Sequence, residues 1–370
     1  MPNEPLFVGL ISGTSLDGID AVLVNASDTI PRLITSRHTP YSPDLLDSLR
    51  RLSLPGDNEI DRLGELDRQV ALAFAESVND LLAQAGISAS EITAIGSHGQ
   101  TVRHRPAAEH PFTLQIGDPN TLAEITGITT VGDFRRRDMA AGGEGAPLVP
   151  AFHQAVLQSP DRSRVVLNLG GIANITCLPK AGEGEVSGFD TGPANTLLDG
   201  WIKKHQGIGY DNGGAWAKEG DVIESLLARL LSDPYFKIPS PKSTGTEYFN
   251  LSWLEPQLGE EPFSPVDVQR TLTELTAASV AMAIDDAQLP NAELLVCGGG
   301  VHNLYLMERL QHRLPNTTVR SSAEVGLDPD WVEAMAFAWL AQRTLSGLTG
   351  NLPSVTGARR AVKLGAIYPG

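Results

Sequence analysis

Apolar runs near the amino terminus predict strands joined by a polar turn. The segments LFVGLI (residues 6–11) and DAVLVNA (20–26) flank the turn SGTSLDGI, and PRLITSRHTPYS (31–42) is a candidate third strand. Asp17 and Gly18 form the residue pair that type I′ hairpin turns favour. The pattern leaves two readings open: a plain hairpin, or a loop that also holds a ligand.

A helical pattern follows these strands. Gly86 is a natural stop for it, and its apolar residues recur at spacings of three and four: Ile60, Leu63, Leu66, Val70 and Phe74. ITAIGSHG (92–99) then returns as a strand, which indicates an α/β chain. Residues 113–150 are dense in glycine and charge, and we interpret them as a loop in a cleft wall, with a flexible linker as the alternative.

The second half of the chain repeats the opening pattern. Residues 163–179 read as an apolar strand, a glycine turn and another apolar strand. Two such units suggest two related domains, which we place at residues 1–155 and 156–332, with the C-terminal helical region 333–370 packing back on the first.

A long helix and a strand–turn–helix unit follow in the second half. The helix has Ser264 as N-cap, Pro265 in its first turn and Asp267 at N3, and one face carries four apolar residues: Val268, Leu272, Leu275 and Met282. Residues 292–314 then predict a buried strand, a triple-glycine turn and a helix.

Composition narrows the class of protein. The 370 residues are 41% hydrophobic and 19% charged, enough for two globular cores, and Asp and Glu outnumber Lys and Arg by 44 to 28. A net charge of −16 opposes binding to nucleic acid and to anionic membranes. Cys177 and Cys297 lie in apolar runs and read as reduced core thiols. The amino terminus has no leader pattern, so we expect a cytoplasmic protein; a homodimer is left open.

Gly298, Gly299 and Gly300 lie between a predicted strand and a helix. Missing side chains there let a ligand approach the backbone, but a tight βα turn explains the triplet equally well. The sequence has no GxxxxGK[ST] motif, and the triplet does not match GxGxxG. A P-loop NTPase and a Rossmann dehydrogenase are therefore disfavoured.

Three glycine turns in order, GTSLDGID, LNLGGIANIT and VCGGGVHN, with the acidic GFDTGPAN between the last two, resemble the sugar kinase, actin and Hsp70 superfamily. GSHGQTVRHRP, GDFRRRDMAAGGEGAPLVP, YDNGGAWAKEG, PKSTGTEYFN and WVEAMAFAWLA sharpen this to a resemblance to the anhydro-N-acetylmuramic acid kinase family. It spans about residues 8 to 345, with Thr246 as a departure where the family often carries Arg. The implied fold is two-domain α/β, ribonuclease H-like, with an interdomain active-site cleft.

The resemblance implies a reaction. ATP and Mg²⁺ would be used on 1,6-anhydro-N-acetylmuramic acid, a small-molecule sugar substrate from the cell wall. Water opens the anhydro bridge while the freed O6 takes the γ-phosphoryl group, giving N-acetylmuramic acid 6-phosphate for peptidoglycan recycling and amino-sugar catabolism. Asp190 would be the general base for the water. From the residues alone, Asp190 reads equally as the N-cap of the helix that follows.

The resemblance also assigns binding residues. Two hairpin tips and a third glycine turn would bind the nucleotide: Gly13, Thr14, Ser15, Leu16, Asp17, Gly18, Ile19, Asp20, Asn168, Gly170, Gly171, Asn174, Gly298, Gly299, Gly300 and Asn303. Asp17 or Asp20 would hold Mg²⁺ through water. The sugar would meet four side chains: His98, Gln100, Arg135 and Glu333. Without the resemblance, His98 reads as a structural histidine and Arg135 as part of the solvated charge run 135–137.

Two rival functions remain at this point. An ATPase of the same superfamily without a sugar acceptor predicts ATP turnover that is indifferent to sugar. A glycoside hydrolase that pairs Asp190 with Glu333 predicts bridge opening without ATP.

Overall fold

The computed structural model describes residues 4–13, 16, 18–289 and 291–370, so the predicted nucleotide residues Thr14, Ser15 and Asp17 lie outside the described residues. The chain divides into two compact units. Unit 1 comprises the chain up to Val156 together with Trp331–Gly370, and unit 2 comprises Leu157–Asp330. Among the described helices, none combines the length and apolar character that crossing a membrane requires.

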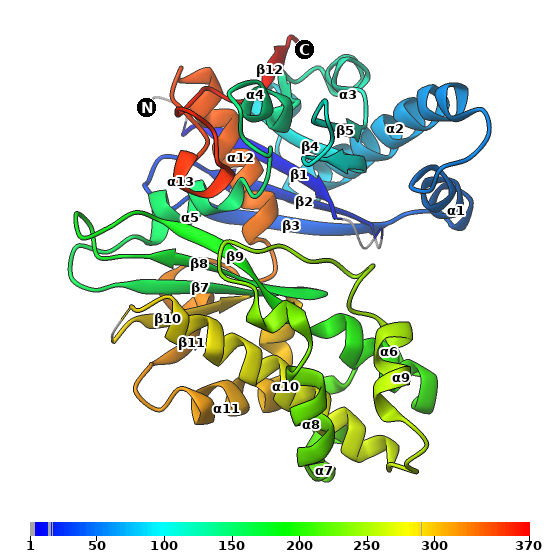
Figure 1. Ribbon diagram of the computed structural model, residues 1–370. Coiled ribbons are helices and arrows are strands. Elements are labelled where there is room, and N and C mark those ends of the chain that lie inside the picture. Colours follow the sequence, from blue (N-terminus) through cyan, green and yellow to red (C-terminus); the bar gives the residue numbers. More distant parts are fainter. Residues whose placement is uncertain (1–3, 14–15, 17, 290) are drawn as a thin grey trace. The chain divides into compact units, whose positions relative to one another are not determined.

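Unit 1 is built on one sheet of seven strands (Figure 1). Its spatial order is β12-β6-β4-β1-β2-β3, and β5 pairs with β4. Strands β1, β2 and β3 are antiparallel neighbours, whereas β4 runs parallel to β1, and β6 runs parallel to β4. The strands have these bounds: β1 Leu6–Ser12, β2 Gly18–Asn25, β3 Arg32–Pro40, β4 Ile92–Arg105, β5 Phe112–Ile116, β6 Thr130–Gly132 and β12 Ala366–Tyr368.

The helices of unit 1 cover this sheet. Their bounds are α1 Pro43–Leu52, α2 Glu59–Ala85, η1 Ala89–Glu91, α3 Pro119–Thr126, α4 Phe134–Ala140, α5 Val149–Leu157, α12 Val332–Leu345 and α13 Pro353–Thr356, with α5 ending at the boundary with unit 2. Helix α12 packs directly on β1 and β4, because Gly9 and Gly96 have no side chain there. A methyl group on Gly9 would collide with the Ala334 carbonyl, and one on Gly96 with that of Phe337.

Unit 2 repeats the strand plan of unit 1. Its sheet has the order β11-β10-β7-β8-β9, in which β7, β8 and β9 are antiparallel and β10 and β11 are parallel additions next to β7. The repeat expected from the two glycine turns is therefore present in the topology, and the predicted α/β class is confirmed. The strands have these bounds: β7 Arg164–Leu169, β8 Ile172–Leu178, β9 Ser187–Pro193, β10 Glu293–Cys297 and β11 Val319–Ser321.

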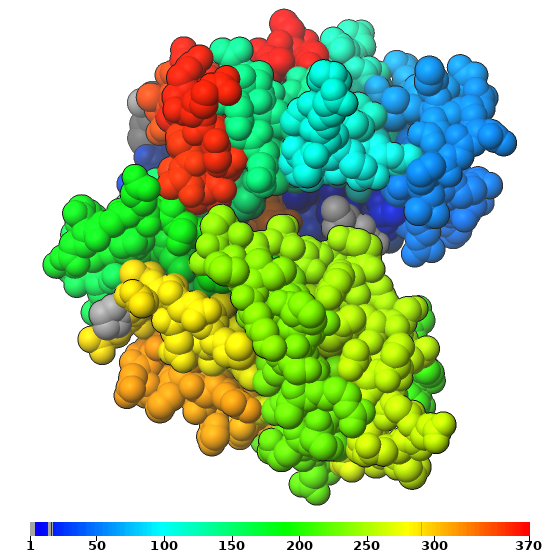
Figure 2. Space-filling view, viewed as in Figure 1, coloured from blue at the N-terminus to red at the C-terminus, as the bar shows by residue number. Residues whose placement is uncertain are grey.

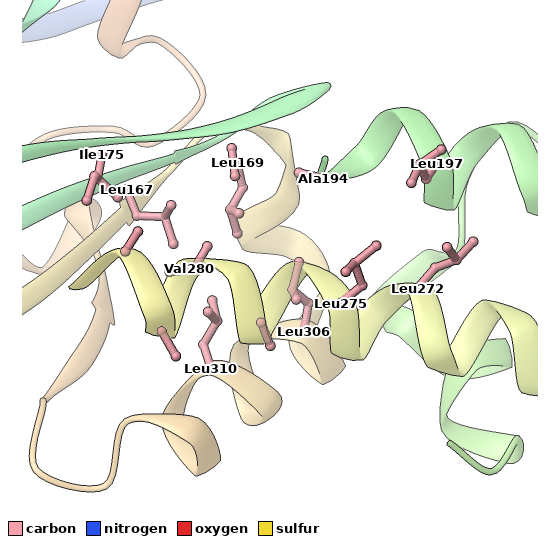
Figure 3. Close-up of a cluster of buried hydrophobic side chains, with 14 of the residues drawn as sticks. Leu167, Leu169, Ile175, Ala194, Leu197, Leu272, Leu275, Val280, Leu306 and Leu310 are labelled. Atoms are coloured by element: carbon pink, nitrogen blue, oxygen red, sulfur yellow. The ribbon is translucent and has the colours of Figure 1, made fainter. Parts of the chain in front are cut away.

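The core of unit 2 surrounds one long helix, α10. Figure 3 shows Val280 and Leu275 of α10 beneath Leu167 and Leu169 of β7, with Leu306 of α11 on the opposite side. Helix α10 is buried on nearly all sides, as expected for a helix between a sheet and other helices. The unit's helices are α6 Asn195–Gln206, η2 Asn212–Gly214, α7 Ala215–Glu219, α8 Glu224–Leu231, η3 Pro234–Lys237, α9 Leu251–Leu258, α10 Pro265–Asp286, η4 Gly299–His302, α11 Leu304–Arg313 and η5 Ser322–Val325.

Two local predictions are wrong. Residues 113–150 form neither one long loop nor a linker, since β5, α3, β6, α4 and the start of α5 fill most of this range. Ile60 and Met282 were expected on buried helix faces, but they are 84% and 41% exposed, since each lies near a helix end. Ser264 does occupy the N-cap of α10, but its side chain makes no capping hydrogen bond.

The first turn of the chain also differs from the hairpin prediction. Gly18 is already the first residue of β2, and its φ lies outside the left-handed region that a type I′ turn requires. Leu16 instead has a φ of 60°. Strands β1 and β2 still form an antiparallel pair, so only the type I′ turn is contradicted, at Gly18, while Asp17 lies outside the described residues. The two cysteines, by contrast, are free and buried as predicted.

Candidate functional site

A row of polar residues crosses the sheet of unit 2. Asn168 on β7 is paired with Asn174 on β8, which is paired in turn with Asp190 on β9. Directly opposed residues in antiparallel strands point to the same face of a sheet. Three residues predicted from the sequence, two for nucleotide binding and one for catalysis, are thus brought to one face.

Asp190 is held by the segment that precedes α9. Its Oδ2 accepts hydrogen bonds from the Thr244 N–H at 2.9 Å and the Ser243 hydroxyl at 3.0 Å. Within the described residues, no donor meets Oδ1. Because Asp190 lies inside β9 and the N-cap of α6 is Ala194, the reading of Asp190 as a helix cap is wrong.

The environment of Asp190 raises its pKa. Burial is the main cause, the two hydrogen bonds to Oδ2 act in the opposite direction, and the nearby Glu247 charge adds to the rise. A carboxylate with a raised pKa and one oxygen open is suited to accept a proton from water.

The turn between β7 and β8 consists of Gly170 and Gly171. Their carbonyl oxygens accept the N–H groups of Asn195 and Thr196, the first residues of α6, both at 3.1 Å. A Cβ on Gly171 would lie 2.6 Å from Thr196 Oγ1, whereas a Cβ on Gly170 would have no heavy atom closer than 3.6 Å. Contacts within the chain therefore require glycine at position 171 but not at position 170.

The triple-glycine turn begins where β10 ends. Gly298 has a φ of 80°, and both Gly298 and Gly300 pack against the end of β7, where a Cβ on Gly300 would lie 2.5 Å from the Leu169 side chain. A Cβ on Gly299 would have no heavy atom within 4 Å. Packing explains the outer two glycines, and the middle one is open to a ligand.

A cavity of about 580 Å³ adjoins this turn inside unit 2. The walls come from the triple-glycine turn, α6 and the segment before α7, and they are lined by Asn195, Leu198, Asp199, Gly209, Tyr210, Asp211, Asn212, Gly213, Gly299, Gly300, His302 and Asn303. This volume falls within the range of small-molecule pockets. Three predicted nucleotide residues, Gly299, Gly300 and Asn303, line it.

Two carboxylates in the cavity were missed by sequence reasoning. Asp211 accepts the Trp216 and Ala217 N–H groups, both at 2.9 Å, and so satisfies two donors in the first turn of α7. Asp199 has no donor among the described residues, and burial together with the charge of Asp211 raises its pKa to about 6. The dense glycines of GIGYDNGG were a signal for a ligand loop there, but nothing in the sequence pointed to Asp199.

His98 and Arg135 lie in contact in unit 1, where His98 is buried and Arg135 is partly buried. His98 Nδ1 lies 2.9 Å from the Gly99 carbonyl and must donate to it, which leaves Nε2 to accept from Arg135 Nε at 2.9 Å. The histidine is neutral because burial and the Arg135 charge hold its pKa well below the usual value. Burial lowers the pKa of Arg135 to about 10, so it keeps its charge at neutral pH, and the Glu333 charge opposes that shift.

Helix α12 contributes two groups to this cluster. The Phe337 ring lies 4.7 Å from the His98 ring, and Glu333, in the first turn, acts on Arg135 electrostatically. The other two arginines of the charge run differ: Arg136 pairs with Asp133 at the surface, and Arg137 is exposed. Of the four predicted sugar-binding residues, the structure therefore brings three together.

The fourth, Gln100, is fully buried beneath the first glycine turn. Its Oε1 accepts from the Ser12 hydroxyl at 2.5 Å, and its Nε2 donates to the Gly13 carbonyl at 3.1 Å. The same Ser12 hydroxyl lies 2.7 Å from the Gly18 carbonyl oxygen, so its one proton is shared between two acceptors. Gln100 thus contacts the nucleotide turn.

Asp20 is the described candidate for holding Mg²⁺. It is partly exposed on β2, and its Oδ1 lies 2.7 Å from Nδ1 of His38, its cross-strand neighbour. Within the part of the chain that the structure describes, no group of three or more His, Cys, Asp or Glu forms a metal-binding cluster. One carboxylate beside a predicted phosphate-binding turn fits Mg²⁺, which keeps several of its water ligands and is held by one or two carboxylates together with substrate phosphates.

A buried carboxylate, Asp138, anchors the glycine-rich loop that follows α4. It accepts from the Gly145 N–H at 2.8 Å, the Asn351 amide at 2.6 Å and the Thr356 hydroxyl at 2.8 Å. Figure 2 shows the C-terminal segment, in red, on the surface of unit 1 beside green residues of this region. The loop is therefore fixed close to Arg135, whose carbonyl lies 3.2 Å from the position of a Cβ on Gly145.

Comparison with known proteins places the chain in a family. The family model for anhydro-N-acetylmuramic acid kinase matches residues 5–370. Proteins of that name from Xylella fastidiosa and Shewanella pealeana are 55% and 54% identical to this chain, covering 100% and 99% of it and 97% and 99% of their own lengths. One from Coxiella burnetii is 51% identical, covering 100% of this chain and 99% of its own length. The chain therefore belongs to the anhydro-N-acetylmuramic acid kinase family.

Proposed function

We propose that this protein uses ATP to convert 1,6-anhydro-N-acetylmuramic acid into N-acetylmuramic acid 6-phosphate, in peptidoglycan recycling. Water attacks C1, the C1–O6 bond breaks, and O6 takes the γ-phosphoryl group as ADP leaves. Membership of the family supports this reaction. The observation that carries it is Asp190, whose Oδ2 is held by two donors while Oδ1 is open.

Asp190 is the general base in this proposal. It takes one proton from the attacking water as the water oxygen bonds to C1. The raised pKa of its carboxyl brings its basicity closer to that needed near neutral pH. Its position in a strand rather than a loop keeps the carboxylate in a defined orientation.

Arg135 is the residue that binds the lactyl carboxylate of the sugar. It is a charged guanidinium whose Nε contacts a neutral histidine, and planar guanidinium groups pair well with carboxylates. Glu333 at the same cluster is placed to accept a hydrogen bond from the sugar. Gln100 acts indirectly, by holding the Gly13 turn.

The nucleoside of ATP occupies the cavity in unit 2, and its phosphates meet the glycine turns. A phosphate oxygen accepts hydrogen bonds, so a phosphate at the turn of Gly170 and Gly171 would use backbone N–H groups. The carbonyls of these two glycines accept from the start of α6. Asp20 would hold Mg²⁺ through water, and Asp17 is the second candidate. When bound, Mg²⁺ neutralises charge on the phosphoryl group in transfer.

One assay distinguishes this reaction from its two rivals. The purified protein is incubated with Mg·ATP and the anhydro sugar, each is omitted in turn, and the sugar product is identified by mass. We expect a product that has gained both one water and one phosphoryl group, and only when both substrates are present. Hydration without ATP would indicate a glycoside hydrolase, and ADP release without sugar an ATPase without an acceptor. The cytoplasmic location and the homodimer stay predictions.

A further inference from the structure

The segment that runs from Lys242 to Phe249 holds Asp190 by both its main chain and its side chain. The Asp190 N–H donates to the Lys242 carbonyl at 3.1 Å, while the next two residues, Ser243 and Thr244, donate to Oδ2. Both carboxylate donors therefore come from adjacent residues of one segment. They meet the same oxygen, Oδ2, and among the described residues no donor meets Oδ1.

A second contact fixes the same strand position from η3. The Tyr235 hydroxyl donates to the Asp190 carbonyl at 2.7 Å. The Lys242 ammonium donates to the Tyr235 carbonyl at 3.2 Å and lies 4.7 Å from the centre of the Tyr235 ring. The backbone of Asp190 is thus held independently of Ser243, and a change at Ser243 should leave it in place.

The segment also brings a negative charge towards the base. Glu247 folds back over Gly245, since a methyl group on Gly245 would collide with the Glu247 carboxylate. A like charge near a carboxylate favours its neutral form, whereas a hydrogen bond to the charged form favours ionisation. Ser243 and Glu247 therefore act on the proton affinity of Asp190 in opposite directions.

We propose that Ser243 and Glu247 are positioning residues that act through Asp190, and that together they set the pH range in which the base is active. This inference rests on the proposed function, in which Asp190 accepts the proton of the attacking water. The influences on the pKa of Asp190 agree with it: the Ser243 hydrogen bond lowers the pKa and the Glu247 charge raises it. The titratable groups around Asp190 are Glu247, Tyr235 and Lys242, and Lys242 meets the carbonyl of Tyr235.

The test is the pH dependence of kcat/KM, measured for the full-length protein and three variants. Ser243→Ala removes a hydrogen bond that lowers the pKa of Asp190, so the acidic limb of the kcat/KM profile should move to higher pH. Glu247→Gln removes a charge that raises this pKa, so the limb should move to lower pH. Each shift should be about half to one pH unit. Ser243→Thr keeps a hydroxyl at this position, so its acidic limb should lie close to that of the wild-type protein. Ionisation of ATP and of the sugar is common to all four proteins, so it cancels in the comparison.

Opposite shifts of the acidic limb in Ser243→Ala and Glu247→Gln support the inference, because a loss of packing alone would not shift the two variants in opposite directions. Limbs that stay in place, or that move in the same direction, would overturn it. Thermal unfolding of each variant shows whether it is folded. Asp190→Asn distinguishes failure of this inference from failure of the proposed function. If Asp190→Asn is inactive but the acidic limbs of the Ser243 and Glu247 variants stay in place, only this inference is wrong. If Asp190→Asn remains active, the role of Asp190 in the proposed function is wrong.

Discussion

Arg135 is a partly buried cation that lies against a neutral histidine. The histidine beside it is neutral and uses Nε2 as an acceptor, so it orients the guanidinium without cancelling its charge. The negative charge of Glu333, in the same unit, favours the charged form of Arg135. A carboxylate on the ligand would therefore meet an oriented cation that has already lost part of its hydration, which strengthens their interaction.

Replacing Arg135 with Lys tests this role. Lys keeps the charge but loses the fork geometry and the Nε contact to His98, so kcat/KM for the anhydro sugar should fall about 10- to 100-fold. A bicyclic sugar without the lactyl group should be affected much less. Arg136→Lys is the matched control, because Arg136 pairs with Asp133 at the surface and should change kcat/KM less than about twofold. An equal loss for both sugars would contradict the assignment.

At the scale of elements, the β7–β8 turn separates a glycine required by packing from one that is not. Gly171 faces Thr196 of α6, whereas Gly170 has space for a methyl group and a φ outside the left-handed region. A phosphate bound to the turn needs that space. Stability and nucleotide affinity should therefore respond differently at these adjacent positions.

Gly170→Ala should leave the melting temperature unchanged or slightly raised, while the Kd for ATP rises about tenfold or more. Gly171→Ala should instead destabilise the fold by roughly 1–3 kcal/mol, because the new methyl group displaces Thr196. Thermal unfolding and calorimetric titration with ATP give the two readouts. Unchanged ATP binding in a stable Gly170→Ala protein would remove this turn from the nucleotide site.

The elements that were predictable from the sequence are those with long patterns or clear stops. Helix α2 ends at Gly86, which adopts a left-handed C-cap, and α10 extends over the predicted range. Helix α1 was missed, although Ser42 caps it and Pro43 begins it, since ten residues carry too few repeats. The short elements of residues 113–150 were hidden by their glycines and charges, which lie in the turns that join them.

The residues of the candidate site also divide into those that a sequence pattern marks and those that only the fold brings together. Glycine turns stand out in the sequence, and the family resemblance added Asp190 as the predicted base; both stay predictions. Asp199 is an ordinary residue of an amphipathic helix in the sequence, and only folding places it in a cavity with Asp211, which lies twelve positions further along. The hydrogen bonds from Ser243 and Thr244 to Asp190 also join residues more than fifty positions apart, so no local sequence pattern predicts them.

At the scale of the whole molecule, the two units repeat one strand plan with different ligand chemistry. Unit 1 gathers His98, Arg135 and Glu333, whereas unit 2 holds the cavity and Asp190. The chain returns to unit 1 at Trp331, and α12 then packs on β1 and β4 of that unit. The same helix carries Glu333, whose charge acts on Arg135.

The most direct test is one experiment on Asp190→Asn beside the wild-type protein. Formation of the hydrated, phosphorylated sugar and the Kd for ATP are measured on the same preparations. We predict that turnover falls by a factor of roughly 10² to 10⁴ while the Kd changes less than about twofold, because the cavity does not include Asp190. Turnover in the variant within tenfold of wild type would contradict the role of Asp190 as the base that couples bridge opening to phosphoryl transfer.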